Sequence, residues 1–312
     1  MQIRYDRPVS RSAFLARRLA LFSLGLLAVV MLAHRFGPLK TPDFVLLVLA
    51  CAIPAALSVP LALIGLARLW QVGALGGVAS AWALVLAALP LGLPGYGYYL
   101  YATKPQLTEV ATDLADRPAW VSPPAAEQHL LPRPALPDDA SARQQAAYPG
   151  LNGRRYEGAI DRVYEAVRKV AAENRMVLTA SRGEEYGLPA LELRPTAEEE
   201  PDAAIEGAAP TPSEDTLPES GPLPTARPEP SQMMVVNDGE PEGTARLQFA
   251  TRTLVLGLPF DAIVRLREEA ETTLVDIRVA SRYGPHDLGM SERIAQGFLH
   301  ALDAELLGIA GN

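Results

Sequence analysis

Long apolar stretches in the first third of the chain constrain its fold more than any other feature of the sequence. The clearest one, residues 44–67, runs for 24 residues without a charged side chain. A helix needs about 20 apolar residues to cross the hydrocarbon core of a bilayer. Pro54 and Pro60 interrupt the stretch, but a membrane helix tolerates proline where neighbouring helices satisfy the freed carbonyl groups. We therefore predict three transmembrane helices, at about residues 13–33, 44–67 and 72–93.

The first stretch has two interpretations. Its apolar core, residues 19–33, is short, and it reaches spanning length only when residues 13–18 join the helix and Arg17 and Arg18 extend to the headgroups. A basic start and a short apolar core also fit a cleaved signal peptide. No small-x-small cleavage site followed by a polar segment is present, because His34, Arg35 and Phe36 come next. An uncleaved first helix is the preferred interpretation.

Charge divides the chain at residue 103. Residues 1–103 contain eight Lys or Arg and two Asp or Glu, whereas the remainder contains 20 basic and 34 acidic residues. A basic, apolar first third followed by an acidic remainder is typical of a membrane anchor with a head domain. An acidic head has no surplus of cations with which to displace the counterions of nucleic acid, so nucleic acid is excluded as a partner. The lone cysteine, Cys51, also excludes an intrachain disulfide and a cysteine-based metal site.

The basic residues also predict an orientation. Five arginines precede the first span and Arg68 follows the second, whereas Arg35, Lys40 and Lys104 fall on the other side. Because the cytoplasmic side carries more Lys and Arg, we predict a multi-pass protein of the inner membrane with its N-terminus in the cytoplasm and its head outside it. The third span ends in a cluster of tyrosines, which is typical of the headgroup level. The middle of each span contains no charged residue or histidine, so we interpret the spans as an anchor in the lipid bilayer and not as a transport path.

The rest of the chain is predicted to be a proline-rich extended strap, residues 104–152, followed by a head domain, residues 153–312. The proline density of the strap excludes long helices and suggests a segment that lies over the domain or leads to it, with a short helix at 138–147. Trp120 and Tyr148 are interpreted as anchors that pin the strap to the sheet. The head contains an insertion, residues 196–243, that is acidic and rich in proline, and we interpret it as a disordered, solvated loop. A calcium site there would need alternating oxygen ligands and a turn glycine, which are missing.

Periodicity predicts the elements of the head. Helical spacing of apolar residues predicts helices at 158–174 and 291–307, and shorter apolar or alternating runs predict the strands. The resulting fold class is a membrane-anchored α+β protein, with three transmembrane helices followed by an antiparallel sheet that has helices packed on one face. Alternation around residues 275–280 predicts that the other sheet face is wet. The predicted strands are residues 176–181, 188–194, 246–256, 261–267 and 273–281.

One polar cluster is a candidate binding site. Arg278, Arg282, His286 and Asp287, together with Asp276 and Ser281, fall at the end of a predicted strand and before a helix, where backbone N–H groups favour anions. The functional interpretation is an anion or carboxylate site with Arg278 and Arg282 as donors. The structural alternative, which we favour, makes Asp276 and Arg278 an exposed cross-strand pair and Asp287 a helix N-cap, with Arg282 bonded to carbonyl groups of the loop.

Known catalytic patterns are not found. Ser281, His286 and Asp287 lie within seven residues and lack a nucleophile-elbow pattern, which argues against a hydrolytic triad. The four histidines lack metal-ligand spacing, and no glycine-rich phosphate loop follows a strand. We therefore predict no catalytic residues, no metal site and no cofactor.

Three passages resemble a known bacterial family, the domain-of-unknown-function family numbered 1499. They are PQLTEVATDLADRP with the following Ala-Trp (residues 105–120), YPGL (148–151) and VDIRVASRYGPHDLG (275–289), and the resemblance covers roughly residues 105–312. The last passage keeps the arginines, the glycines and Asp287 of the family pattern, but has Ala280 at one position and Pro285-His286 before the aspartate. The resemblance implies a bacterial envelope domain of unassigned activity and supplies no catalytic residues.

Taken together, these features predict a non-enzymatic, membrane-anchored protein whose extracytoplasmic head binds a partner, with another envelope protein as the candidate. The alternative is a membrane-tethered enzyme, or a binder of lipid or a small anion, that uses the cluster from Arg278 to Asp287. A pocket on which Arg278, Arg282 and His286 converge would favour the alternative.

Overall fold

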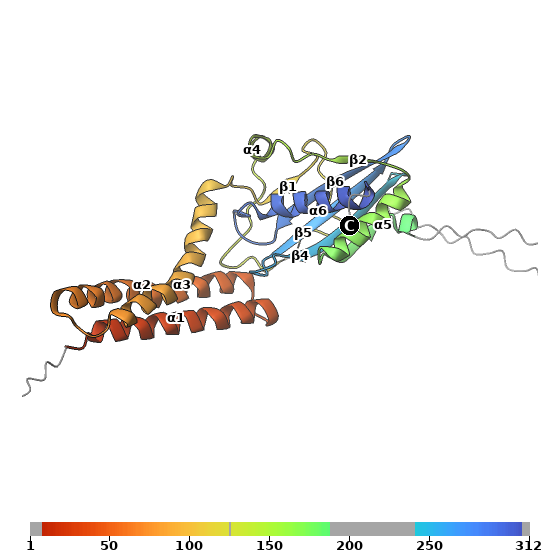
Figure 1. The fold of residues 1–312 in the computed structure, drawn as a ribbon. Helices are drawn as coiled ribbons and strands as arrows, with labels where there is room; N and C mark the ends of the chain where they lie inside the picture. Colours follow the sequence, from red (N-terminus) through yellow and green to blue (C-terminus); the bar gives the residue numbers. More distant parts are fainter. Residues whose placement is uncertain (1–7, 125, 188–240, 308–312) are drawn as a thin grey trace, which may run out of the picture. The chain divides into compact units, whose positions relative to one another are not determined.

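The computed structural model describes residues 8–124, 126–187 and 241–307. Three long helices come first, and strands and shorter helices follow (Figure 1). The first three helices are α1 (Arg11–Phe36), α2 (Thr41–Val72) and α3 (Gly77–Thr103). The strands are β1 (Glu109–Ala111), β2 (Arg154–Glu157), β3 (Val177–Arg182), β4 (Thr244–Arg252), β5 (Pro259–Glu268) and β6 (Thr272–Ser281). The remaining helices are α4 (Ala140–Ala147), α5 (Ile160–Glu173), the short 3₁₀ helix η1 (Glu184–Gly187) and α6 (Met290–Leu306).

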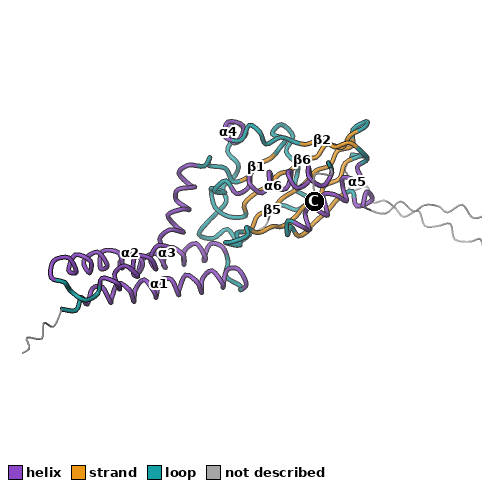
Figure 2. Tube along the Cα trace, viewed as in Figure 1, coloured by secondary structure: helices purple, strands orange, loops and turns teal. Residues whose placement is uncertain are grey.

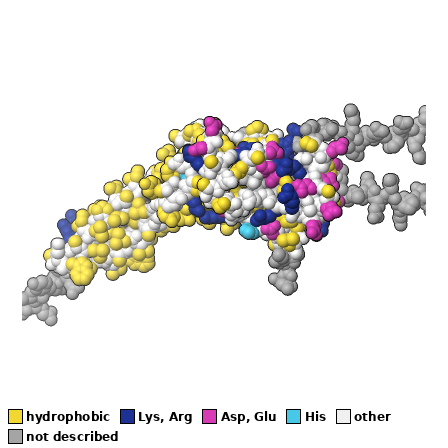
Figure 3. Space-filling view, turned by 90° about the horizontal axis from the view of Figure 1, so that it is seen from above, with side chains coloured by type: hydrophobic (Ala, Val, Ile, Leu, Met, Phe, Trp, Pro, Cys, Tyr) yellow, Lys and Arg dark blue, Asp and Glu magenta, His cyan; other side chains and the backbone are white. Residues whose placement is uncertain are grey.

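Helices α1, α2 and α3 are each long and apolar enough to cross a membrane. Apolar side chains dominate the surface of this part of the molecule, and charged side chains gather on the head (Figure 3). The predicted third span begins too early, because Gly73 adopts a left-handed conformation with φ 65° and ends α2 there. Helix α3 changes direction along its length (Figure 1), and Pro90 and Pro94 inside it account for the bend.

Small side chains let the three helices approach one another closely. A core of six alanines, two from each helix, lies between them. A methyl group added at Gly65 would come within 2.3 Å of the Ser80 hydroxyl oxygen and 2.9 Å of the Ala13 Cβ atom. Small residues at such contacts are the usual solution in a bilayer, where packing must replace the hydrophobic effect as the driving force.

The head is built on one open antiparallel sheet. Its strand order is β1-β6-β5-β4-β3, and β2 pairs with β6 beside β1, so β6 has two short partners along one edge. The register of the central β5–β6 hairpin places Arg265 opposite Asp276 and Val264 opposite Ile277. The alternation of apolar and charged residues in both strands therefore continues across the sheet, with apolar side chains on one face and charged side chains on the other.

Helices α5 and α6 cover the apolar face (Figures 1 and 2). Helix α5 contributes Val163, Val167 and Val170 at helical spacing, and α6 contributes Phe298 and Leu302. These side chains pack with Leu247, Phe249, Val264, Leu266, Val275, Ile277 and Val279 of the sheet. The prediction of an α+β head with helices on one sheet face is confirmed.

The opposite sheet face is not wet, and this prediction was wrong. Asp276 and Ala280 on that face are 3% and 0% exposed. The proline-rich segment after β1 lies against them: the backbone N–H groups of Val121 and Ser122 donate to the Gln248 side chain, both at 3.0 Å. Alternation shows that a face is polar, but it does not show that a distant loop supplies the matching polar groups.

Other predictions can be compared with the elements one by one. The helices at 158–174 and 291–307 are α5 and α6, and the strands around 176–181, 261–267 and 273–281 are β3, β5 and β6. Strand β4 ends at Arg252, because a turn follows in which the Gly257 N–H group donates to the Thr253 carbonyl before β5 begins. The short strands β1 and β2 were not predicted. The predicted strand at 188–194 and most of the insertion at 196–243 lie outside the described residues.

Candidate functional site

Arg278, which belongs to the predicted cluster and lies in β6, is held in a buried ionic network. Its guanidinium group lies 2.8 Å from Glu109, whose side chain is 1% exposed, and 4.9 Å from the centre of the Trp120 ring. Arg117 and Arg133 bind the same carboxylate at 2.9 Å and 2.6 Å. One buried carboxylate thus joins β1, β6 and the proline-rich segment, and Trp120 covers the arginine, in agreement with its predicted pinning role.

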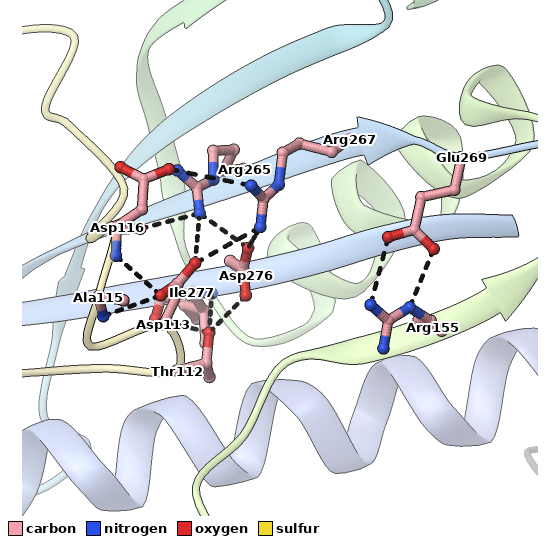
Figure 4. Close-up of polar contacts among 10 residues, drawn as sticks. All are labelled: Thr112, Asp113, Ala115, Asp116, Arg155, Arg265, Arg267, Glu269, Asp276 and Ile277. Atoms are coloured by element: carbon pink, nitrogen blue, oxygen red, sulfur yellow. Dashed lines mark hydrogen bonds and ion pairs between the residues drawn. The ribbon is translucent and has the colours of Figure 1, made fainter.

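A second network lies on the same sheet face (Figure 4). The buried carboxylate of Asp276 accepts hydrogen bonds from Arg265 at 3.0 Å and Arg267 at 3.1 Å, and from the Thr112 hydroxyl at 3.1 Å. Arg265 also donates to Asp113 and Asp116, which follow β1. Some ion pairs of these networks join two strands, such as Arg265 with Asp276. Others join a strand to the proline-rich segment, such as Arg265 with Asp113 and Arg117 with Glu109, and these hold the segment on the sheet.

His286 and Asp287 point into the loop that leads to α6. The Leu288 N–H group donates to Nδ1 of His286 at 2.7 Å, so Nε2 carries the proton and donates to the Lys104 carbonyl at 3.2 Å. Asp287 accepts from the N–H groups of Gly289 at 2.8 Å and Ser291 at 3.3 Å. Burial raises the pKa of the Asp287 carboxyl group. The N-cap of α6 is Gly289, so the prediction that Asp287 is the N-cap residue was wrong by two positions. Asp287 nevertheless bonds to two backbone N–H groups at the start of α6 and orders it, which is a structural role.

Arg282 lies apart from these side chains. It forms a two-pronged ion pair with the buried carboxylate of Asp261 in β5, at 2.8 Å and 2.7 Å, and this pairing raises the pKa of Arg282. Arg278, His286 and Asp287 do not line a shared pocket with it. Of the four predicted site residues, Arg282 lines a pocket of about 520 Å³, and the other three are not among the described residues that line it.

That pocket has a volume of about 520 Å³ and lies at the end of the sheet where β4 ends and β5 begins. It draws residues from the α5–β3 turn, the β4–β5 loop and the first half of α6. Five of its lining residues are arginines, and none is acidic: Arg35, Arg175, Arg252, Arg282 and Arg293.

Four of the five arginines of this pocket differ from those of the two networks, because they have no carboxylate partner among the described residues. Among the described residues, only Arg282 of the five forms an ion pair. The lining also includes the apolar side chains of Met176, Ile294 and Phe298. Four guanidinium groups without a carboxylate partner among the described residues can bind a negatively charged group, because Arg binds phosphate and carboxylate oxygens in pairs.

A larger recess of about 850 Å³ lies beside the α1–α2 connection, and acidic side chains are among its lining residues. Lys40 pairs there with Glu127, and His129 lies 3.4 Å from Asp43. This recess offers an anion no surplus of positive charge. The described residues also hold no cluster of three His, Cys, Asp or Glu side chains that could bind a metal ion.

Sequence reasoning found Arg282 and missed the other four pocket arginines. They come from α1, the α5–β3 turn, the end of β4 and α6, which are far apart in the sequence. Arg175 carries one local signal, since it follows the predicted helix stop at Asn174 and has a positive φ of 57°. Only the fold brings these segments together.

Comparison with known proteins places the head in a family. Residues 129–302 match the family described as "Protein of unknown function (DUF1499)". No curated protein and no solved structure matches the chain. The matched region extends from the segment before α4 into α6, and it leaves the three apolar helices outside. Because the match covers more than half of its 312 residues, the chain belongs to the DUF1499 family.

Proposed function

We propose that this protein is a membrane-anchored binding protein whose head holds an anionic group in the arginine pocket. The single observation that carries the proposal is the excess of positive charge in that pocket, where four of five arginines lack a carboxylate partner among the described residues. Arginines without a carboxylate partner keep their N–H groups available, so an anion in the pocket can accept charge-assisted hydrogen bonds from them.

The composition of the pocket favours binding over catalysis. Its described lining contains no His, Cys, Asp, Glu or Lys side chain that could act as a general acid, a general base or an activated nucleophile. Thr251, Thr253 and Asn174 add hydrogen-bonding groups around the arginines. The alternative site, the cluster from Arg278 to Asp287, contributes only Arg282, because the other three side chains hold the proline-rich segment and the start of α6.

The test is a binding measurement with glycerol 3-phosphate as the probe, on the full chain in a neutral detergent. Arg175→Gln combined with Arg252→Gln is expected to weaken binding at least about tenfold, because each change removes a charge-assisted hydrogen bond. The matched control is Arg162→Gln with Arg168→Gln, two exposed α5 arginines outside the pocket. Equal binding by the pocket variant and the control would overturn the proposal.

A second variant fills the pocket without removing charge. Gly297 lines the pocket, and an added Cβ atom there would meet no atom within 4 Å. Gly297→Leu is therefore expected to fold at least as stably as the natural chain, since glycine costs about 1 kcal/mol inside a helix. It should nevertheless lose affinity for glycerol 3-phosphate, because the leucine side chain occupies the space of the ligand. Unchanged affinity would contradict a ligand in this pocket.

We also propose that the head lies outside the cytoplasm, in the envelope of a bacterium. The support is the excess of arginine on one side of the predicted membrane over the basic residues on the head side. Five arginines lie within the first 18 residues and Arg68 lies near the end of α2, against Arg35, Lys40 and Lys104. A reporter that is active only outside the cytoplasm should be active when fused after Asn312 and silent when fused after Arg68. The reverse pattern, with both fusions stably expressed, would place the head in the cytoplasm.

A further inference from the structure

We infer that the anionic group is the phosphate of a phospholipid headgroup from the bilayer that α1, α2 and α3 would cross. This inference rests on the proposed anion-binding function and identifies the class of ligand. It is supported by the position of the pocket, by an exposed apolar loop beside it and by the apolar side chains that line it.

The pocket lies next to the end of a candidate membrane span. Arg35, one of its five arginines, is the second-last residue of α1. The preceding residue, His34, donates from Nδ1 to the Leu256 carbonyl of the β4–β5 loop at 2.8 Å. Its Nε2 atom accepts from the Thr41 hydroxyl of α2 at 3.1 Å, and its ring stacks on Phe44 with a centroid separation of 4.2 Å. These contacts join the β4–β5 loop of the head to the end of the span, where lipid headgroups would lie.

The β4–β5 loop itself presents apolar side chains to the outside. Leu254 and Val255 are 69% and 71% exposed, and Arg252 precedes them at the pocket. Leu256 and Leu258 of the same loop pack instead against the apolar cluster of α1 and α2. Exposed apolar residues next to arginines are typical of segments that lie in the interfacial layer of a bilayer, with the cations at the phosphates.

The apolar lining residues of the pocket distinguish a lipid from a free phosphate. Four apolar side chains are among those that line it: Met176, Leu254, Ile294 and Phe298. An inorganic anion makes no use of them. A phospholipid places its phosphate among the arginines and the first carbons of its chains against the apolar side chains, so both kinds of lining residue are used.

The test compares three probes on the full chain in a neutral detergent: glycerol 3-phosphate, dihexanoylphosphatidylglycerol and dihexanoylphosphatidylcholine. The phosphatidylglycerol is expected to bind at least about tenfold more tightly than glycerol 3-phosphate, since burial of about two methylene groups accounts for that factor. It should also bind about tenfold more tightly than the zwitterionic lipid, which has the same chains and no net charge.

Two variants separate the two parts of the ligand. Leu254→Ser should reduce the preference for the lipid over glycerol 3-phosphate and leave the affinity for glycerol 3-phosphate unchanged. Leu307→Ser, which changes an exposed leucine at the other end of α6, should change neither. Arg175→Gln with Arg252→Gln should weaken the binding of both anionic probes.

Each contrary result has its own meaning. Failure of all anionic probes to bind would overturn the proposed function and the lipid inference with it. Binding of glycerol 3-phosphate as tightly as phosphatidylglycerol would overturn the lipid inference alone and leave a soluble anion as the ligand. Equal affinity for the two lipids would also overturn the inference, because apolar adsorption would then explain the binding.

Discussion

Replacing Glu109 with alanine is expected to lower the free energy of unfolding of the head by about 3–5 kcal/mol, the cost of breaking a buried ion pair from one side. The Glu109 side chain is 1% exposed, and the three arginines around it, Arg117, Arg133 and Arg278, are 15%, 19% and 17% exposed. Without the carboxylate, three poorly hydrated cations face one another. The decrease in the free energy of unfolding should therefore exceed the contribution of any single hydrogen bond between Glu109 and these arginines.

Urea unfolding of the full chain in detergent measures this effect, with Trp120 as the probe. Trp120 stacks on Arg278 in the head, and Trp70 and Trp82 lie in α2 and α3, so phenylalanine at these two positions leaves a signal from the head alone. Asp139→Ala is the control, since Asp139 forms an exposed pair with Arg143 in which both side chains are about half exposed. Its loss should be at most about 1 kcal/mol. Similar losses for the two variants would mean that the Glu109 network is solvated and does not hold the proline-rich segment.

Replacing Asp276 with alanine is the second change with a large expected effect, again about 3–5 kcal/mol. Asp276 is the only carboxylate drawn in Figure 4 that lies within the sheet, and its side chain is 4% exposed. Arg265, at 8% exposure, would lose its most buried partner and keep only Asp113 and Asp116 of the proline-rich segment. The Thr112 hydroxyl would lose an acceptor as well.

The same figure contains the matched control. Arg155 and Glu269 form a pair with similar geometry, at 2.9 Å, but their side chains are 63% and 38% exposed. Glu269→Ala should therefore cost at most about 1 kcal/mol, because water replaces the lost partner and solvent screens the charge. A loss for Asp276→Ala no larger than that for Glu269→Ala would show that burial does not strengthen the network.

Much of the fold could be predicted from local patterns. An uncharged run such as residues 44–67 has few alternatives to a membrane-crossing or buried helix, and helical spacing in α5 or alternation in β6 reports which face is apolar. These patterns depend on neighbours within a few residues. The ends of elements depend on single backbone conformations, such as the left-handed Gly73 that ends α2, and were predicted less well.

The polar face of the sheet shows where such reasoning stops. Asp276 and Arg278 are charged, and a charged sheet face is usually solvated. Here Glu109, 169 positions away in the sequence, supplies the opposite charge to Arg278, and Asp113 pairs with Arg265, 152 positions away. No local pattern reports these pairings. The pocket could not be predicted for the same reason. Its arginines are far apart in the sequence, and only the fold brings them together.

Hydrogen exchange of the full chain, with and without glycerol 3-phosphate, tests the central claim of an anion held in the arginine pocket most directly. The pocket account predicts slower exchange in two stretches that line it, residues 174–177 and 250–254, and in the first half of α6. Exchange around residues 278–287 should change little outside Arg282, because Arg278, His286 and Asp287 are already bonded within the head. Protection confined to residues 278–287, or protection nowhere at saturating probe, would contradict the claim.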